Sequence, residues 1–421
     1  MATAHQTITV LPIGKLFYFS YCNQIFMFKY IVIVFTGLLI TATTYSQKVI
    51  SQTDAVSMAV KNSKNISAAG LSVLQQKQLL KSSINLPNPE VFIESPTGKF
   101  YTGSITQSFE FPTVYSKQYQ LQKQRIALAE KEKGLTENEV KFQVKQLYLL
   151  LQYASALQQQ LYIQDTVYER ISKAASRQFD AGQIDYLQKA FAESQYGEIH
   201  NQYLQAQLTI NNFQNQLQYL TGLPDTFVAE PLNKNPLIDL SVTIDSTAFV
   251  ANPSVQIFNQ AGVIAQKNIA LQKAKALPGL AVSYFNQGER NTPIGNRFRV
   301  GITVPLWFGQ YKSNINAAKT EWEINKQKTS GLQQQLSVQL LQSKNEVLIY
   351  TQSLQYYKNS GIPKANEIIS TARRFFENGE NDYINYLRNI NDAYSIQLKY
   401  LETIRNYNQA LLSINYLTGK L

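Results

Sequence analysis

Few residues in this sequence could carry out acid–base, nucleophilic or metal chemistry. The 421 residues include two histidines, His5 and His200, and one cysteine, Cys22. Soft-ligand metal sites need clusters of such side chains, and no Gly-rich phosphate loop or nucleophile elbow is present. His200 stands alone among polar neighbours, which indicates an exposed surface histidine. We therefore predict that the chain is not an enzyme and holds no resident metal or cofactor.

Carboxylates flank two glycines in matching segments, FDAGQIDYL at 179–187 and FENGENDYI at 376–384. Paired carboxylates can act as general acid and base, but Asp beside a turn glycine is also typical of helix caps. Because both pairs occupy the same place in a repeated segment, we predict caps and not catalysts. The residues concerned are Asp180, Gly182 and Asp185 in the first segment, and Glu377, Gly379 and Asp382 in the second.

These segments belong to an internal duplication. Tyr-Leu-Thr-Gly occurs at 219–222 and again at 416–419, and both this motif and the glycine segments recur after 197 residues (416 minus 219, and 376 minus 179). Features repeated in a fixed order indicate a duplicated structural unit. Each half is predicted to form a helix, a strand hairpin, a very long helix, a glycine turn and a helix. The predicted parts are a leader (1–46), a first repeat (47–222), a linker (223–250) and a second repeat (251–421).

Strands with one apolar and one polar face are predicted in each half. A helix over 53–86 should end at the following prolines, with strands at 90–94, 101–111 and 297–305. Alternate side chains lie on opposite faces of a strand. The apolar set includes Ile105, Phe109, Phe298, Val300, Ile302 and Val304, and the polar set includes Thr106, Glu110, Arg297, Arg299 and Thr303. The polar face fits either the solvated side of a soluble sheet or a water-filled lumen opposite lipid, and the signal peptide described below favours the lumen.

Two runs, 113–177 and 308–376, are rich in Gln, Leu, Lys, Glu and Ala and nearly free of helix breakers. Apolar residues in them step by three, four and seven, which is coiled-coil spacing. A helix of such length spans roughly 90 Å. Gly361 and Pro363 predict a kink or helix junction in the second run.

The N-terminal region predicts export. Met27 begins a short basic segment, followed by about ten apolar residues and then small residues up to Ser46, which is typical of a secretory signal peptide. A permanent anchor is the alternative, but the apolar run is shorter than the roughly 20 residues that a spanning helix needs. We expect the mature chain to start near Gln47, without Cys22. The formal charge of +11 is spread singly along the sequence, so no nucleic-acid partner is expected.

The two Gly turns, the two Tyr-Leu-Thr-Gly helix ends, the Asn252-Pro253 helix start and the prolines Pro112 and Pro305 together resemble the TolC family of outer-membrane factors. The resemblance covers about 47–421. It implies a mainly α fold with a small β part, in which long coiled-coil helices of a homotrimer form an α-barrel in the periplasm. Four strands per chain would contribute to a twelve-stranded transmembrane β-barrel in the outer membrane, since four strands cannot close a barrel alone.

In that family the Gly turns lie at the periplasmic tip, which closes the tunnel and meets an adaptor protein. By position the tip comprises 177–187 and 373–387 here, with Gln188 and Asn385 where members commonly place a pore-facing acid. The tip residues implied are Arg177, Asp180, Gly182, Asp185, Gln188, Arg373, Arg374, Glu377, Gly379, Asp382 and Asn385.

The resemblance also implies the partners: a periplasmic membrane-fusion adaptor, an inner-membrane pump of the RND or ABC type, and outer-membrane lipid. The function expected is a passive exit duct for efflux or type I secretion. A periplasmic helical-hairpin adaptor or scaffold is the alternative, and the duplicated hairpin-plus-helix unit argues against it. Cargo stays open between drugs, heavy-metal cations and polypeptides.

Overall fold

The computed structural model describes residues 48–95, 98, 101–222, 227–234, 249–286, 293–306 and 308–421. The fold below is that of the compact unit Val49–Leu421. The predicted leader at 1–46 lies outside the described residues. The fold is mainly helical with a small β part, as the sequence predicts, and this β part consists of two sheets.

The first half is built around one very long helix. Its elements are β1 (Lys48–Ile50), α2 (Gln52–Asn62), α3 (Lys64–Ser82), β2 (Glu90–Glu94), β3 (Thr102–Phe109), α4 (Pro112–Asp180), α5 (Tyr186–Thr221) and β4 (Phe227–Ala229). Pro112 is well placed in the first turn of α4, where its missing N–H is not needed. At 69 residues α4 extends for roughly 100 Å.

The second half repeats the order of helix, strand hairpin, long helix, turn and helix, with the single helix α6 in the place of α2 and α3 and with an interrupted long helix. Its elements are α6 (Pro253–Lys275), β5 (Gly279–Asn286), η1 (Ile294–Arg297), β6 (Phe298–Thr303), α7 (Phe308–Tyr356), η2 (Tyr357–Gly361), α8 (Ile362–Glu377) and α9 (Tyr383–Thr418). The segment η2 is a π-helical turn, so the junction predicted from Gly361 and Pro363 is confirmed. A Cβ at Gly361 would lie 2.9 Å from the Tyr357 ring and 3.5 Å from Ile396, so close packing requires glycine there.

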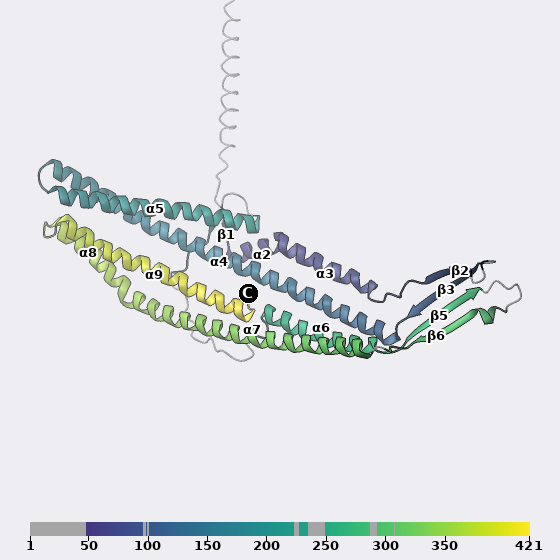
Figure 1. Ribbon diagram of the computed structural model, residues 1–421. Coiled ribbons are helices and arrows are strands. Elements are labelled where there is room, and N and C mark those ends of the chain that lie inside the picture. Colours follow the sequence, from purple (N-terminus) through teal and green to yellow (C-terminus); the bar gives the residue numbers. More distant parts are fainter. Residues whose placement is uncertain are drawn as a thin grey trace, which may run out of the picture. The chain divides into compact units, whose positions relative to one another are not determined.

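Four strands form one antiparallel sheet in the order β2-β3-β5-β6. Figure 1 shows them side by side, beyond the ends of the helices α4, α6 and α7. The strand predicted at 90–94 is confirmed, whereas β3 ends at Phe109 and β6 begins at Phe298, each shorter than predicted. β1 and β4 pair separately.

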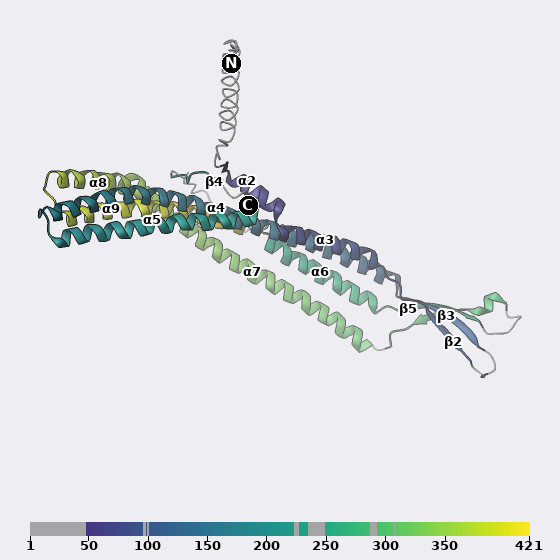
Figure 2. The ribbon, with the colours of Figure 1, turned by 90° about the horizontal axis from the view of Figure 1, so that it is seen from above.

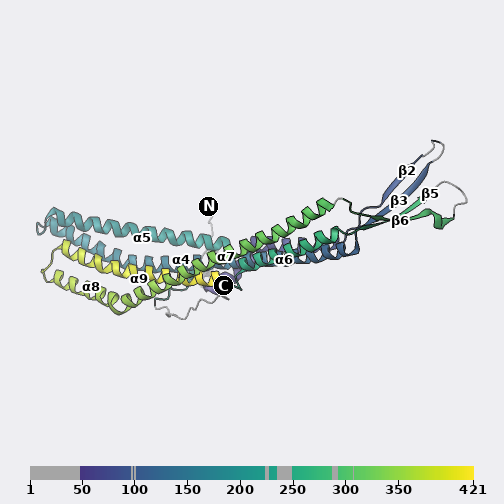
Figure 3. The ribbon, with the colours of Figure 1, turned by 60° about the horizontal axis from the view of Figure 1, so that its bottom comes forward.

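The helices pack along both halves of α4. Near the strands α4 lies between α3 and α6, and α6 packs on α7. Towards the Gly turns α4 packs on α5 and α9, and α9 packs on α8. Figures 2 and 3 show these neighbours together from two directions. Buried side chains such as Val144, Leu340 and Ile404 fill the seams, each contributing about 1.5–3 kcal/mol through burial.

The single helix predicted over 53–86 is wrong. Ser63 has an extended backbone and separates α2 from α3, and its hydroxyl accepts a hydrogen bond from the Ile66 N–H at 3.3 Å. Next to it, the Asn62 side-chain amide donates to the Thr221 carbonyl at 2.7 Å, which ties the break to the end of α5. A tertiary contact thus favours two short helices over one.

Candidate functional site

The four-stranded sheet has one apolar face whose side chains are exposed. The register places Val91, Ile105, Tyr284 and Phe298 in one row across the sheet. Alternate residues of β6 extend this face, with Phe298 54%, Val300 78% and Ile302 66% exposed. Three exposed apolar side chains at alternate positions of one strand are typical of a surface that contacts a nonpolar partner or a nonpolar solvent.

The opposite face of the sheet carries mostly polar side chains, together with Phe92 and Phe285. Glu90, Thr106, Ser283 and Arg299 form the neighbouring row. The hydroxyls of Thr106 and Ser283 lie 2.9 Å apart, and the Arg299 guanidinium lies 4.5 Å from the centre of the Phe285 ring. These contacts hold the row in place.

The predicted face residues separate as expected within the strands. Ile105, Phe109, Phe298, Val300 and Ile302 share the apolar face, and Thr106, Arg299 and Thr303 share the polar face. Val304 and Glu110 lie just outside β6 and β3.

Arg297 does not belong to a strand. It ends η1, and its Nη1 donates to the Tyr284 hydroxyl at 3.3 Å, on the side of the apolar row. The alternation of residue types continues through Arg297, but the 3-10 turn interrupts the strand geometry, so its side chain does not follow the pattern.

The two Gly turns have the same geometry. Gly182 and Gly379 have φ of 70° and 77°, a region that glycine occupies without strain. After α4, the Gln183 N–H donates to the Gln178 carbonyl; after α8, the Glu380 N–H donates to the Phe375 carbonyl. This is the Schellman ending, which satisfies the last carbonyls of a helix.

Asp185 and Asp382 are N-caps, as predicted. Asp185 Oδ1 accepts from the Gln188 N–H at 2.8 Å, and Asp382 Oδ1 accepts from the Asn385 N–H at 2.7 Å. Each cap begins a helix of 36 residues. Gln188 and Asn385 thus supply the N–H groups that the caps bind.

The remaining predicted tip residues are exposed. Arg373 pairs with Glu377 at 2.7 Å, and Arg374 Nη2 donates to Thr371 Oγ1 at 3.3 Å. Arg177 and Asp180 lie in the last turn of α4. In the described part of the chain no arginine forms an ion pair with Asp185 or Asp382.

A tyrosine-rich core supports the tip. Tyr168, Tyr386 and Tyr394 are buried together where α4, α8 and α9 meet, and the Phe376 ring stacks on Tyr386 at 4.6 Å. Burial raises the pKa of the Tyr168 hydroxyl well above its ordinary value. Among the described residues, none forms a hydrogen bond with the Tyr168 hydroxyl.

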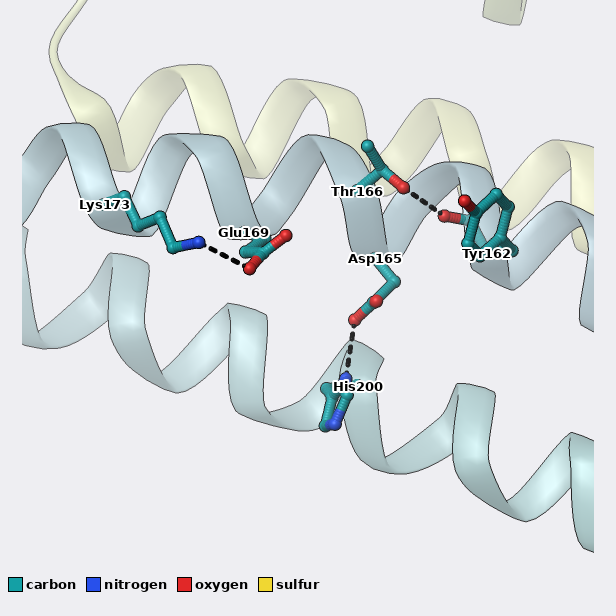
Figure 4. Close-up of polar contacts among 6 residues, drawn as sticks. All are labelled: Tyr162, Asp165, Thr166, Glu169, Lys173 and His200. Atoms are coloured by element: carbon teal, nitrogen blue, oxygen red, sulfur yellow. Dashed lines mark hydrogen bonds and ion pairs between the residues drawn. The ribbon is translucent and has the colours of Figure 1, made fainter. Parts of the chain in front are cut away.

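His200 is not isolated, contrary to the prediction. Its Nδ1 lies 3.0 Å from Asp165 Oδ1, so the pair joins α5 to α4 (Figure 4). One turn along α4, Lys173 binds Glu169 at 2.6 Å and lowers the pKa of that carboxyl. Asp165 and His200 are 35 residues apart in the sequence, and no sequence pattern predicts that they pair.

Neither a membrane-spanning helix nor a metal-binding cluster occurs in the parts of the chain given above. No described helix has an apolar stretch that could cross a membrane. No three described His, Cys, Asp or Glu side chains are grouped to hold a metal ion.

Comparison with known proteins gives a consistent result. Residues 246–420 match the family described as outer membrane efflux protein. The chain is 20% identical to the cobalt-zinc-cadmium resistance protein CzcC of Cupriavidus metallidurans, over 87% of this chain and 89% of that one.

Two solved structures share the fold. The CmeC outer membrane channel of Campylobacter jejuni has a TM-score of 0.72 and 16% identity, over 88% of this chain and 85% of that one. The open state of the MtrE outer membrane channel of Neisseria gonorrhoeae has a TM-score of 0.69 and 14% identity, over 87% and 88%. The match over residues 246–420 and the fold shared with these channels show that this chain has a TolC-like outer membrane channel fold and is similar to the outer membrane efflux proteins.

Proposed function

We propose that three copies of this chain close a twelve-stranded barrel in the outer membrane and form a passive exit duct. The observation that carries the proposal is the four-stranded sheet with an exposed apolar face and two edge strands, β2 and β6, that pair on one side only. The unpaired backbone groups of an edge strand can bind a further strand, and closing the sheet into a barrel removes these edges.

The proposal places lipid at the apolar face of the sheet and the lumen at the other face. Phe298, Val300, Ile302 and Val304, with Ile105 and Phe109, face lipid. Arg299, Thr303 and Thr106, with Glu110, face the lumen, and Arg297 lies at the rim beside Tyr284. Side chains alternate between the two faces of the sheet, so the polar row would line the lumen, which can then hold water.

The tip at Gly182 and Gly379 is the proposed gate and docking end. It would meet a periplasmic adaptor, which connects the duct to an inner-membrane pump of the RND or ABC type. Threefold symmetry turns Asp185 and Asp382 into rings of carboxylates, which favour cations at the entrance. Residues 1–46 would direct export, and the parts 47–222, 223–250 and 251–421 would be the two repeats and their linker.

Divalent metal cations are the first cargo to test, since the relative named above is a cobalt-zinc-cadmium resistance protein. Cargo of this kind would pass without tight binding to the described residues, which lack a metal-binding cluster.

Fractionation and native mass measurement test the proposal. We expect the chain in the outer membrane as a trimer, with subunits that begin near Gln47, and single-channel conductance in planar bilayers. A monomer in the soluble periplasmic fraction would contradict the duct, and retention of Cys22 in the mature mass would contradict the predicted cleavage.

A further inference from the structure

Lysines gather where the helices meet the four-stranded sheet. Each of α3, α4, α6 and α7 has at least one lysine within about 8 Å, along its axis, of its strand-proximal end. We call this set the junction lysines: Lys81, Lys117, Lys273, Lys275 and Lys312. They are far apart in the sequence, but the fold brings the four helix ends together beside the strands (Figure 1).

Acidic residues are excluded from the same helix ends. Neither α3 nor α6 contains an acidic residue. In α4 the first is Glu130, about 27 Å from the helix start, and in α7 it is Glu321, about 20 Å from the start. Glu90 and Glu110 lie on the strand side, and in the described part of the chain neither forms an ion pair with a junction lysine.

Helix dipoles do not explain this distribution. Lysine is favourable at the C-terminal ends of α3 and α6, where Lys81, Lys273 and Lys275 lie. Lys117 and Lys312, however, lie near the N-terminal ends of α4 and α7, where the dipole favours acids instead. A positive charge at helix ends of both polarities points to an anionic partner outside the helices.

A cavity of about 480 Å³ at the junction has a mixed lining. Lys275 lines it together with the apolar Phe111, Val304 and Leu306, and the Glu110 carboxylate lies in the same lining. Val304 follows Ile302 by two residues and so continues the apolar row of β6. A lysine beside apolar side chains, at the level where the sheet ends, matches a phospholipid: a phosphate for the ammonium and an acyl chain for the cavity.

We propose that the junction lysines form a collar that binds anionic phospholipid headgroups of the periplasmic leaflet of the outer membrane. The proposal rests on the proposed function, because the apolar face of the sheet must lie in that membrane. Trimer formation would repeat the five lysines around the barrel. Phosphates at this level would fix the depth of the barrel in the membrane, since each nearby lysine adds to the attraction.

The test uses the full-length trimer in vesicles of phosphatidylcholine with roughly one third phosphatidylglycerol, a composition that supplies a negative surface. Lipids retained after mild detergent extraction are counted by native mass spectrometry. The variant carries Lys→Gln at all five junction lysines. A matched control carries Lys→Gln at five exposed lysines elsewhere: Lys61, Lys64, Lys328, Lys358 and Lys420.

We expect the parent and the control to retain phosphatidylglycerol over phosphatidylcholine by about tenfold or more, and the junction variant to lose this preference. Lys→Arg at the same five positions should restore it, because the charge is kept. The preference should also weaken with salt.

An unchanged preference in the junction variant would overturn the proposal. If that variant instead lost only chloride permeability in planar bilayers, the lysines would face the lumen, which also overturns it. Conductance of the parent in neutral phosphatidylcholine tests the duct separately: lipid preference without conductance would refute the duct and leave the collar standing.

Discussion

Gly419, at the end of α9, is the position where one methyl group should cost most. Its φ is +69°, and it lies against the start of α6, where Asn252 is buried. Asn252 Oδ1 caps α6 by accepting from the Ser254 N–H at 2.9 Å, and its Nδ2 donates to the Leu417 carbonyl at 2.8 Å. The same residue thus joins the end of one helix to the start of another.

The change Gly419→Ala adds two costs. Alanine in the left-handed region costs about 1 kcal/mol. In addition, the new Cβ would lie 2.7 Å from the Ala251 carbonyl carbon and 3.1 Å from the Asn252 nitrogen, and closer still to the Ala251 oxygen. Backbone atoms cannot rotate away, so overpacking adds about 1–3 kcal/mol. We expect a loss of about 2–4 kcal/mol in the free energy of unfolding.

Two other glycines provide matched controls. Gly182 has the same φ but no atom within 4 Å of its Cβ position, so Gly182→Ala should cost only about 1 kcal/mol. Gly222 is the counterpart of Gly419 in the first repeat, and its Cβ would meet the flexible Asn62 amide at 3.1 Å, so Gly222→Ala should fall between. Denaturant unfolding of the three variants, followed by circular dichroism, measures the order. Equal losses for Gly419→Ala and Gly182→Ala would refute the steric argument.

Three further predictions concern the sheet, the tip and the core below it. Ile302→Arg should reduce stability by about 2–4 kcal/mol if Ile302 faces mid-bilayer, whereas Arg299→Gln should be mild; equal yields of inserted trimer would exclude the face assignment. Asp185→Ala and Asp382→Ala each remove a cap and should each reduce stability by about 0.5–2 kcal/mol. Asp→Asn at both positions keeps the caps and removes the charge, so an altered cation preference in planar bilayers would assign the two carboxylates a role in the gate. An unchanged cation preference would show that they act only as helix caps. At neutral pH, Tyr168→Phe should leave stability unchanged or raise it by about 1 kcal/mol, because it removes a hydroxyl that has no partner among the described residues. Above pH 10.0 the parent should lose stability faster than the variant, since burial raises the pKa of the Tyr168 hydroxyl in the folded state and the unfolded chain ionises first. Parallel curves of stability against pH for the two proteins would contradict this prediction.

Sequence reasoning succeeded where the signal is local and repeated. Gly182, Gly379, Asp185 and Asp382 act within a single turn of chain, so their types and spacing determine the turn and the cap that the structure shows. The strand faces followed from alternation for the same reason, except at Arg297, which lies in the 3-10 turn before β6. The interruption at Gly361 was also local, because proline removes a backbone donor two residues later.

The sequence predictions were wrong where contacts between segments far apart in the sequence determine the structure. The break at Ser63 depends on the contact between Asn62 and the end of α5, and the pairing of His200 depends on Asp165 in another helix. The collar of lysines was invisible for the same reason: each lysine is isolated in the sequence, and only the packing of four helices brings them to one level. Composition alone had suggested that the positive charge was dispersed.

The π-helical turn at 357–361 has an evolutionary consequence. If the two repeats were separate copies of one half-length chain, the same sequence would have to form both the uninterrupted α4 and the interrupted run from α7 to α8. Fusion of two copies into one polypeptide removes that demand, because each copy can then accumulate its own changes. The interruption therefore marks a point at which the two repeats of the fused chain are no longer equivalent.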